Sequence, residues 1–140
     1  MNKSVMEVLP QKPPFLMVDR ILELVHGKKA VGIKTLGSNE PYFSGHFPGH
    51  PIMPGVLLIE AINQVGEYVL LNDPKFNGKL VFFAGCNNVR FRRPAVPGDV
   101  LLITTELVDS ESRIGLGRGK IEIEGKLACE ADLSFYIEGQ

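Results

Sequence analysis

A histidine in a proline-rich loop and a glutamate in an apolar run are the residues of this chain whose types and spacing suit chemistry. Residues 45–51 read Gly-His-Phe-Pro-Gly-His-Pro, and Glu60 follows within a run that is otherwise apolar. The imidazole of His46 can accept or donate a proton near neutral pH. A carboxyl group among apolar neighbours has a raised pKa, so it can hold a proton at pH 7 and donate it. A base and an acid presented together predict an elimination or a hydration, in which one proton is removed and another is delivered.

The segment around His46 is expected to be a stiff loop that leads directly into a helix. It contains three prolines, Pro48, Pro51 and Pro54. Each proline fixes φ and removes a backbone donor, so neither a helix nor a central strand can run through the segment. Its apolar side chains, Phe47, Ile52 and Met53, predict partial burial. The alternative is a structural turn in which a backbone carbonyl satisfies His46, and the presence of Glu60 favours the functional interpretation.

A helix is predicted from Gly55 to about Asn72, and its apolar side chains should be wrapped by the rest of the domain. Its polar residues fall on one narrow stripe: Glu60, Asn63, Gln64 and Glu67. For Gln64 and Glu67 a solvated face is an open alternative, whereas Glu60 lies in the first two turns, near the His46 loop. The free backbone N–H groups at the helix start can hold an oxyanion, such as the enolate of a thioester.

Composition limits the possible functions. The chain has 140 residues, 44% of them hydrophobic, which suffices for one domain with a core. The net charge of −1 gives no support for a general nucleic-acid role. The sequence shows no leader and no apolar run of membrane length, which predicts a soluble, cytoplasmic protein. Cys86 and Cys129 have no metal-ligand spacing and are expected to be free thiols in a reducing compartment.

The remainder of the chain has the pattern of antiparallel strands. From 127 to 137 apolar residues alternate with the set Ala128, Glu130, Asp132, Ser134 and Tyr136. Glu124-Gly125 predicts a hairpin turn after a strand around 121–123. Further strands are predicted at about 17–25, 29–37, 80–92 and 99–109, and a short helix at 2–8. One apolar helix among many strands predicts a single α+β domain over 1–140, with a curved sheet wrapped around a central helix.

Several collinear motifs together resemble the 3-hydroxyacyl-(acyl-carrier-protein) dehydratases of bacterial type II fatty-acid synthesis. Besides the histidine loop and the acidic helix, they comprise Leu9-Pro10, Pro14 to Arg20, Asn39-Glu40-Pro41, Met53 to Leu57, Phe83-Ala84-Gly85, Arg90-Phe91, Arg93-Pro94 and Val96 to Asp99. The resemblance spans nearly the whole chain. It implies a hot-dog fold and a homodimer, with three dimers often forming a hexamer.

The resemblance also assigns roles to residues. His46 of one subunit and Glu60 of the other would form the catalytic pair, the Gly55 N–H would contact the thioester carbonyl, and Gln64 would hold the carboxylate. The implied reaction turns a 3-hydroxyacyl thioester into the trans-2-enoyl thioester and water, without a metal or redox cofactor. The related dehydratase-isomerases typically carry aspartate where this chain has Glu60 and His50, which favours dehydration without isomerisation.

The partner implied by the resemblance is an acyl carrier protein. Arg90, Arg92 and Arg93 are candidates for docking this acidic partner, with Lys79 as a further candidate, and an ordinary strand with solvated arginines is the open alternative. Phe82 and Phe83 are candidates for the wall of an acyl tunnel, or for plain core.

Three segments depart from the family pattern: Gln11-Lys12-Pro13, Asn63, and Cys86 to Val89. The stretch from Cys86 to Val89 is expected near the mouth of the acyl tunnel, so its departure bears on acyl chain-length preference and on the choice of carrier protein. His46 and Glu60 are unchanged, so activity is expected to be kept. The rival functions are a hot-dog thioesterase and a catalytically silent acyl-binding subunit.

Overall fold

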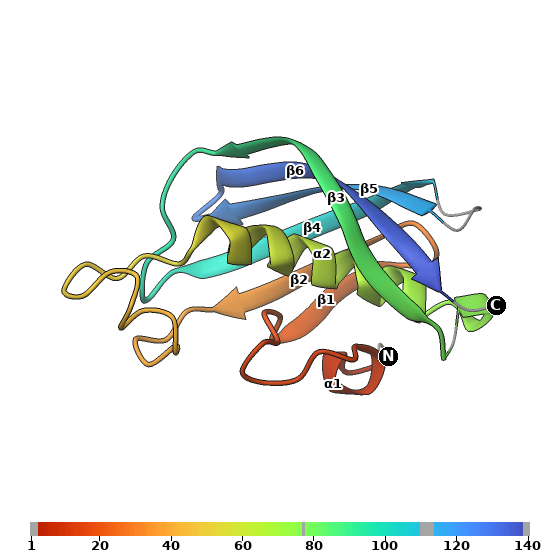
Figure 1. The fold of residues 1–140 in the computed structure, drawn as a ribbon, viewed down its shortest axis with the longest axis horizontal. Helices are drawn as coiled ribbons and strands as arrows, with labels where there is room; N and C mark the ends of the chain where they lie inside the picture. The colour runs from red at the N-terminus through yellow and green to blue at the C-terminus, as the bar shows by residue number, and fades with distance from the viewer. Residues whose placement is uncertain (1–2, 77, 110–113, 139–140) are drawn as a thin grey trace.

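A single six-stranded antiparallel sheet curves around one long helix (Figure 1). A computed structural model describes residues 3–76, 78–109 and 114–138 of the chain. The helical elements are α1 (Val5–Val8), α2 (Gly55–Leu71) and the short 3₁₀ turn η1 (Pro74–Phe76). The strands are β1 (Arg20–Val25), β2 (Lys29–Thr35), β3 (Leu80–Phe91), β4 (Val100–Asp109), β5 (Ile114–Ile123) and β6 (Lys126–Glu138), in the spatial order β1-β2-β4-β5-β6-β3. This arrangement is the hot-dog fold and confirms the predicted α+β class.

The β5–β6 hairpin confirms the alternating pattern, with one exception. Glu124 and Gly125 connect the two strands, and both have positive φ, at 52° and 76°. The register shifts between Ile121 and Glu122, so the extra residue Ala128 is left between the partners of these two residues. Ala128 is therefore fully buried instead of lying on the outer face with the polar residues. A period-two pattern cannot reveal such a bulge.

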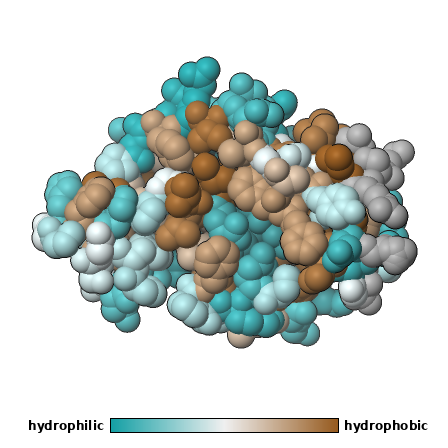
Figure 2. Space-filling view, viewed as in Figure 1, coloured by the Kyte–Doolittle hydropathy of each residue, from teal (hydrophilic) through white to brown (hydrophobic). Residues whose placement is uncertain are grey.

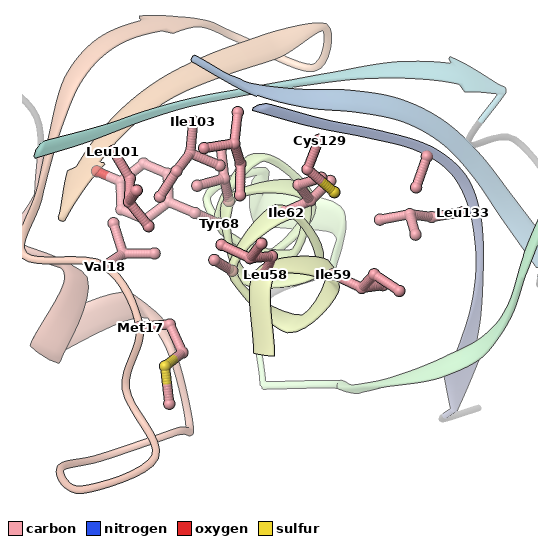
Figure 3. Packing of buried hydrophobic residues seen from close by; sticks show 14 of the residues in the cluster. Met17, Val18, Leu58, Ile59, Ile62, Tyr68, Leu101, Ile103, Cys129 and Leu133 are labelled. Carbon is pink, nitrogen blue, oxygen red and sulfur yellow. The ribbon is translucent and has the colours of Figure 1, made fainter. Parts of the chain in front are cut away.

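The core lies between the concave face of the sheet and α2, where side chains of helix and sheet point toward one another (Figure 3). Ile62 and Ile103 are fully buried there. Gly119 of β5 allows close approach, because a Cβ at this position would lie 2.2 Å from Cγ2 of Ile62. The Thr105 hydroxyl donates to the Ile62 carbonyl at 2.8 Å and ties β4 to the helix. These contacts fix both the depth and the rotation of α2.

The N-terminal segment closes the core beside α2. In α1, Ser4 and Glu7 form a capping box, in which each side chain accepts from the other residue's backbone N–H. The helix ends before Pro10, as predicted, while the expected start at residue 2 lies outside the described residues. Val5 and Leu9 are buried in the core.

Strand β3 forms one edge of the sheet and pairs only with β6 among the described strands. Its large apolar side chains are substantially exposed: Leu80, Phe82, Phe83 and Phe91. Figure 2 shows hydrophobic side chains along the course of β3 on this face. Phe82 and Phe83 are therefore not part of the core of this chain.

Candidate active site

The loop before α2 holds His46 through backbone hydrogen bonds. The Phe47 N–H donates to the His50 carbonyl at 3.0 Å, and the His50 N–H donates to the Phe47 carbonyl at 2.8 Å. The Ile52 N–H donates to the His46 carbonyl at 2.8 Å. As predicted, neither a helix nor a strand runs through the segment, which forms a hydrogen-bonded turn. Of its three apolar residues, Phe47 is 50% exposed and only Met53 is fully buried.

The His46 ring is oriented by a backbone carbonyl. Nδ1 lies 2.9 Å from the Ile52 carbonyl oxygen, and since a carbonyl only accepts, Nδ1 carries a proton. In the neutral ring, Nε2 is then unprotonated and can accept a proton. The hydrogen bond to a backbone carbonyl that a purely structural histidine would make is thus present. It uses Nδ1 alone and leaves Nε2 free for proton transfer.

His46 and the start of α2 share a pocket of about 480 Å³. Its lining residues come from the loop, the first turn of the helix, the end of β3 and the segment that follows it: His46, Ile52, Met53, Gly55, Leu58, Phe91, Arg92, Arg93 and Pro94. The lining is mainly apolar, and Met53 and Leu58 are almost fully buried. The pocket therefore combines one imidazole with a helix N-terminus in a hydrophobic setting.

Gly55 is the first residue of α2 and faces this pocket. The preceding Pro54 makes no side-chain cap, and its carbonyl accepts from the N–H groups of Leu57 and Leu58. The N–H groups of Gly55 and Val56 precede the first helical bond, so they can be offered to an oxygen in the pocket. A Cβ at Gly55 would lie 2.8 Å from the Phe91 ring, which is why glycine fits here.

Glu60 does not line the pocket that holds His46. It lies two residues beyond Leu58, which places it about 200° around the helix. Its carboxyl group accepts from Nε2 of Gln64 at 2.9 Å and from Nδ2 of Asn63 at 3.4 Å. Burial raises the pKa of Glu60, and these two hydrogen bonds oppose that rise. The raised pKa confirms the expectation from its apolar surroundings, but the chain by itself does not bring Glu60 and His46 into one pocket.

Gln64 anchors Glu60 to the N-terminal segment. Its Oε1 accepts from the Met17 N–H at 2.7 Å, and its Nε2 donates to the Phe15 carbonyl at 3.0 Å as well as to Glu60. Gln64 is fully buried and Glu67 is 1% exposed, so the alternative of a solvated helix face is wrong for both residues. The segment that precedes β1 covers this side of the helix.

Glu67, Asn63 and Gln11 form a polar cluster next to Glu60 that sequence reasoning did not identify as functional. Oε2 of Glu67 accepts from Nδ2 of Asn63 at 2.7 Å and from Nε2 of Gln11 at 3.0 Å. Burial raises the pKa of Glu67 to about 7, and the charge of Glu60 adds to the rise. The sequence feature that could have identified Glu67 is its position seven residues after Glu60, on the same face of the helix.

The three candidate docking arginines differ in their surroundings. Arg92 pairs with Glu130 through Nε at 3.1 Å and Nη2 at 2.6 Å, and Arg93 lies 3.8 Å from Glu124. Arg92 and Arg93 line the pocket with His46, whereas Arg90 is exposed on β3. Lys79 lies at a different cavity, beside Lys3 and Lys12.

The structure also bears on metals and membranes. Within residues 3–76, 78–109 and 114–138, no group of three His, Cys, Asp or Glu side chains is placed to hold a metal ion. None of the described helices has the length and apolar character needed to cross a membrane. Both cysteines are free thiols, with Cys86 exposed and Cys129 buried.

Known proteins similar to this chain include solved structures of the same fold. The dehydratase heterocomplex ApeI:P from Xenorhabdus doucetiae matches with a TM-score of 0.86 and 20% identity, covering 100% of this chain and 94% of the other. A hypothetical thioesterase from Streptococcus pneumoniae matches with a TM-score of 0.66 and 16% identity, covering 86% of each chain. At these identities, the likeness shows the fold alone.

Sequence relatives give a closer match. The sequence model of the FabA-like domain matches residues 9–132. The 3-hydroxyacyl-[acyl-carrier-protein] dehydratase FabZ of Syntrophomonas wolfei is 53% identical over 97% of this chain and 94% of its own length. The protein of the same name from Caldicellulosiruptor saccharolyticus is 50% identical over 96% of each chain. The chain therefore belongs to the FabA-like domain family and, within it, to the FabZ 3-hydroxyacyl-[acyl-carrier-protein] dehydratases.

Proposed function

We propose that this protein is a hydro-lyase that converts 3-hydroxyacyl-(acyl-carrier-protein) thioesters into trans-2-enoyl thioesters and water in fatty-acid or related acyl-chain biosynthesis. The observation that carries the proposal is the orientation of His46. Its Nδ1 is committed to the Ile52 carbonyl, so Nε2 is available as a base in an apolar pocket that also contains the helix N-terminus. The relatives named above, at about half identity over nearly the whole chain, support the same reaction.

The reaction assigns one role to each site residue. Nε2 of His46 removes a proton from C2, and the electron pair of the broken C–H bond is delocalised onto the thioester oxygen as an enolate. This pair then forms the C2=C3 double bond as the C3–O bond breaks. The Gly55 N–H donates to the thioester oxygen, where negative charge develops. Protonated Glu60 gives its proton to the departing hydroxyl group, which leaves as water. Gln64 holds the Glu60 carboxyl in position through the bond at 2.9 Å.

We further propose that the site is completed between two copies of the chain. Glu60 lies outside the pocket with His46, which fits a pair formed by His46 of one subunit and Glu60 of the other. The free edge of β3, with its exposed Phe82 and Phe83, is the surface best suited to a second copy. A trimer of such dimers, as the family resemblance implies, is part of the same proposal.

The remaining parts of the proposal concern the partner and the setting. An acyl carrier protein would deliver the substrate to the cytoplasmic enzyme, with Arg90 and Arg93 at the docking surface and Arg92 held by Glu130. Residues 1–140 would act as one catalytic domain. The enzyme would need no metal or redox cofactor, because His46, Gly55 and Glu60 account for both proton transfers and for the charge on the thioester oxygen.

The reaction can be tested with a short 3-hydroxyacyl thioester, followed by ultraviolet absorbance and mass spectrometry. Wild-type protein should form the conjugated enoyl thioester, and Glu60→Gln should reduce turnover by about 10²–10⁴-fold while keeping the fold. Release of free thiol by the wild type would instead identify a thioesterase. Binding without turnover, on short and carrier-bound substrates alike, would identify an acyl-binding subunit.

The shared site can be tested by complementation. His46→Ala and Glu60→Gln chains, carrying different tags, would be co-expressed and the mixed dimer purified. If the pair is completed between subunits, one of the two sites in a mixed dimer contains both the His46 imidazole and the Glu60 carboxyl. About half of the wild-type activity per dimer is then expected. Activity no higher than that of either variant alone would place the whole pair within one chain.

A further inference from the structure

The aromatic ring of Phe47 is stacked on the imidazole of His46. The two ring centroids lie 4.0 Å apart, with an angle of 27° between the ring planes. Neutral aromatic pairs prefer offset or edge-to-face arrangements with centroids about 4.5–7 Å apart, and Tyr42 and Phe43 form such a pair at 4.9 Å. The face of an aromatic ring attracts a positive charge that lies within about 6 Å of its centroid. The contact between Phe47 and His46 therefore suits a charged imidazole better than a neutral one.

The reaction proposed above creates this charge. Nδ1 of His46 already carries a proton, so the imidazole becomes positive when Nε2 accepts the proton from C2. Glu60 still holds its own proton at that step and is not a counter-ion. Among the described residues, no carboxylate forms an ion pair with His46. Arg92 and Arg93, which line the same pocket, oppose a further positive charge there.

We propose that Phe47 is a positioning residue for His46, whose ring holds the imidazole in place and stabilises the positive charge that it acquires during dehydration. This inference rests on the proposed role of His46 as the base. The attraction is stronger once the charge develops than in the neutral ground state, so it should raise kcat rather than strengthen substrate binding. Phe47 does not line the pocket and leaves its space to the substrate.

The backbone of the loop holds Phe47 where this role requires it. Its N–H and carbonyl groups exchange two hydrogen bonds with His50, at 3.0 and 2.8 Å. The Ile52 carbonyl restrains the imidazole at Nδ1 while Phe47 covers one face of the ring, so both contacts leave Nε2 free. The Phe47 side chain is 50% exposed and contributes little to the core. The stack on His46 is therefore the contact that its ring is placed to make.

The test weakens the negative face of the ring while keeping its shape. In the full-length protein, Phe47 is replaced by 4-fluoro-, 3,5-difluoro- and 3,4,5-trifluorophenylalanine, and steady-state kinetics are measured on the short 3-hydroxyacyl thioester. Because each fluorine weakens the attraction of the ring face for a cation, kcat should fall stepwise, by about two- to fivefold over the series, with KM nearly constant. A purely structural role predicts no such trend. The trifluorinated ring in place of Tyr136, a half-exposed residue on β6, is the matched control and should leave kcat unchanged.

Two natural substitutions test the stack without fluorine. Phe47→Tyr keeps the ring and should keep kcat within about twofold, whereas Phe47→Leu keeps an apolar side chain and should lower kcat by about three- to tenfold. Proton NMR measures the stack directly. The carbon-bound protons of the His46 ring should be shifted upfield by the neighbouring ring in the wild type and in Phe47→Tyr, and this shift should be lost in Phe47→Leu.

The outcomes separate this inference from the proposed function. A stepwise fall in kcat at constant KM supports the role of Phe47. A flat series in an active enzyme, or a trend confined to KM, overturns the inference and leaves the dehydratase intact. A wild type that forms no enoyl thioester overturns the proposed function and this inference with it. If the fluorinated chains do not fold, equal kcat values for Phe47→Tyr and Phe47→Leu overturn the inference, and the expected difference supports it.

Discussion

At the scale of single residues, this protein places ionisable and backbone groups where their surroundings alter their chemistry. Nδ1 of His46 is held by the Ile52 carbonyl, which leaves Nε2 free. The partly buried carboxyl group of Glu60 accepts hydrogen bonds from the side-chain amides of Asn63 and Gln64. Gly55 contributes only its backbone, and Phe91 occupies the space that a side chain there would need. Each of these features can be tested by a separate substitution.

Gly55→Ala is expected to disturb the pocket, because its new Cβ would meet the Phe91 ring at 2.8 Å. A displacement of about 1 Å near reacting groups lowers kcat/KM by up to about 10²-fold. Steady-state kinetics on the short thioester would measure the loss. The double variant Gly55→Ala/Phe91→Leu should recover part of the activity, and no recovery would argue against the steric explanation.

The raised pKa of Glu67, about 7, makes stability depend on pH. The native carboxyl group binds its proton more tightly than the unfolded one, whose pKa is about 4.5. The stabilisation from this group is therefore fully present below pH 4.5 and is lost as pH rises toward and through 7. The loss is on the order of 3 kcal/mol. Urea unfolding at several pH values should show this decline in the wild type and a smaller one in Glu67→Gln, and parallel curves would contradict it.

At the scale of elements, the position of α2 against the sheet depends on small residues in β5. The contact between Gly119 and Ile62 leaves no room for a methyl group, whereas β4 adds a hydrogen bond through Thr105. The position of the helix that carries Gly55, Glu60 and Glu67 is thus determined by packing contacts two to three turns away from its N-terminus. Changes in β5 should therefore affect the site indirectly.

Gly119→Ala should destabilise the fold by about 1–3 kcal/mol, because it overpacks a full core. Denaturant unfolding would measure the change. Gly45→Ala serves as the matched control, since nothing lies within 4 Å of its added Cβ. In an Ile62→Leu background, which lacks the clashing Cγ2, the cost of Gly119→Ala should fall, and an unchanged cost would place the strain elsewhere.

At the scale of the whole molecule, the exposed apolar edge of β3 and the separation of Glu60 from His46 both favour assembly. A monomer of 15.4 kDa would leave these surfaces in water. Arg92 and Arg93, which line the pocket, add a second type of surface, which we propose contacts the acidic carrier protein rather than another copy. The two surfaces predict different consequences of substitution.

Phe83→Glu should weaken the proposed dimer, because it introduces a charge on the exposed edge strand, where Phe83 is 40% exposed in the single chain. Light scattering should show a shift toward the mass of one chain, with a parallel loss of turnover. Lys126→Glu, on the exposed start of β6, is the control. An unchanged mass for Phe83→Glu would exclude this edge as the interface.

Arg93→Glu should lower kcat/KM for carrier-bound substrate by about tenfold at low salt, because a basic patch accelerates the approach of an acidic partner. Turnover of a short thioester without the carrier should change much less. An equal loss on both substrates would show that Arg93 acts within the pocket and not in docking.

Most of the fold could be predicted from the sequence, because periodic patterns and turn residues act locally. The long helix begins at Gly55 as expected, and five of the strands lie within a few residues of their predicted ranges. The strand predicted around 121–123 is an exception, because β5 already begins at Ile114. Its inward positions there are the glycines at 115, 117 and 119, which give no apolar alternation in the sequence. The bulge at Ala128 and the exposure of Phe82 depend on register and sheet order, which are long-range properties. The same limit applies to the site: the burial of Glu67 depends on Gln11, which lies 56 residues away in the sequence.

The location of the pocket has a further consequence for how such enzymes diversify. His46 and Gly55 come from the loop and the first turn of α2, while Phe91 to Pro94, which also line the pocket, come from the end of the edge strand β3 and the residues after it. The proposed proton-transfer and oxyanion groups and the rest of this lining therefore come from separate stretches of the sequence. Exchange of the second stretch between relatives should retune which acyl chains are accepted while the proton-transfer groups stay in place.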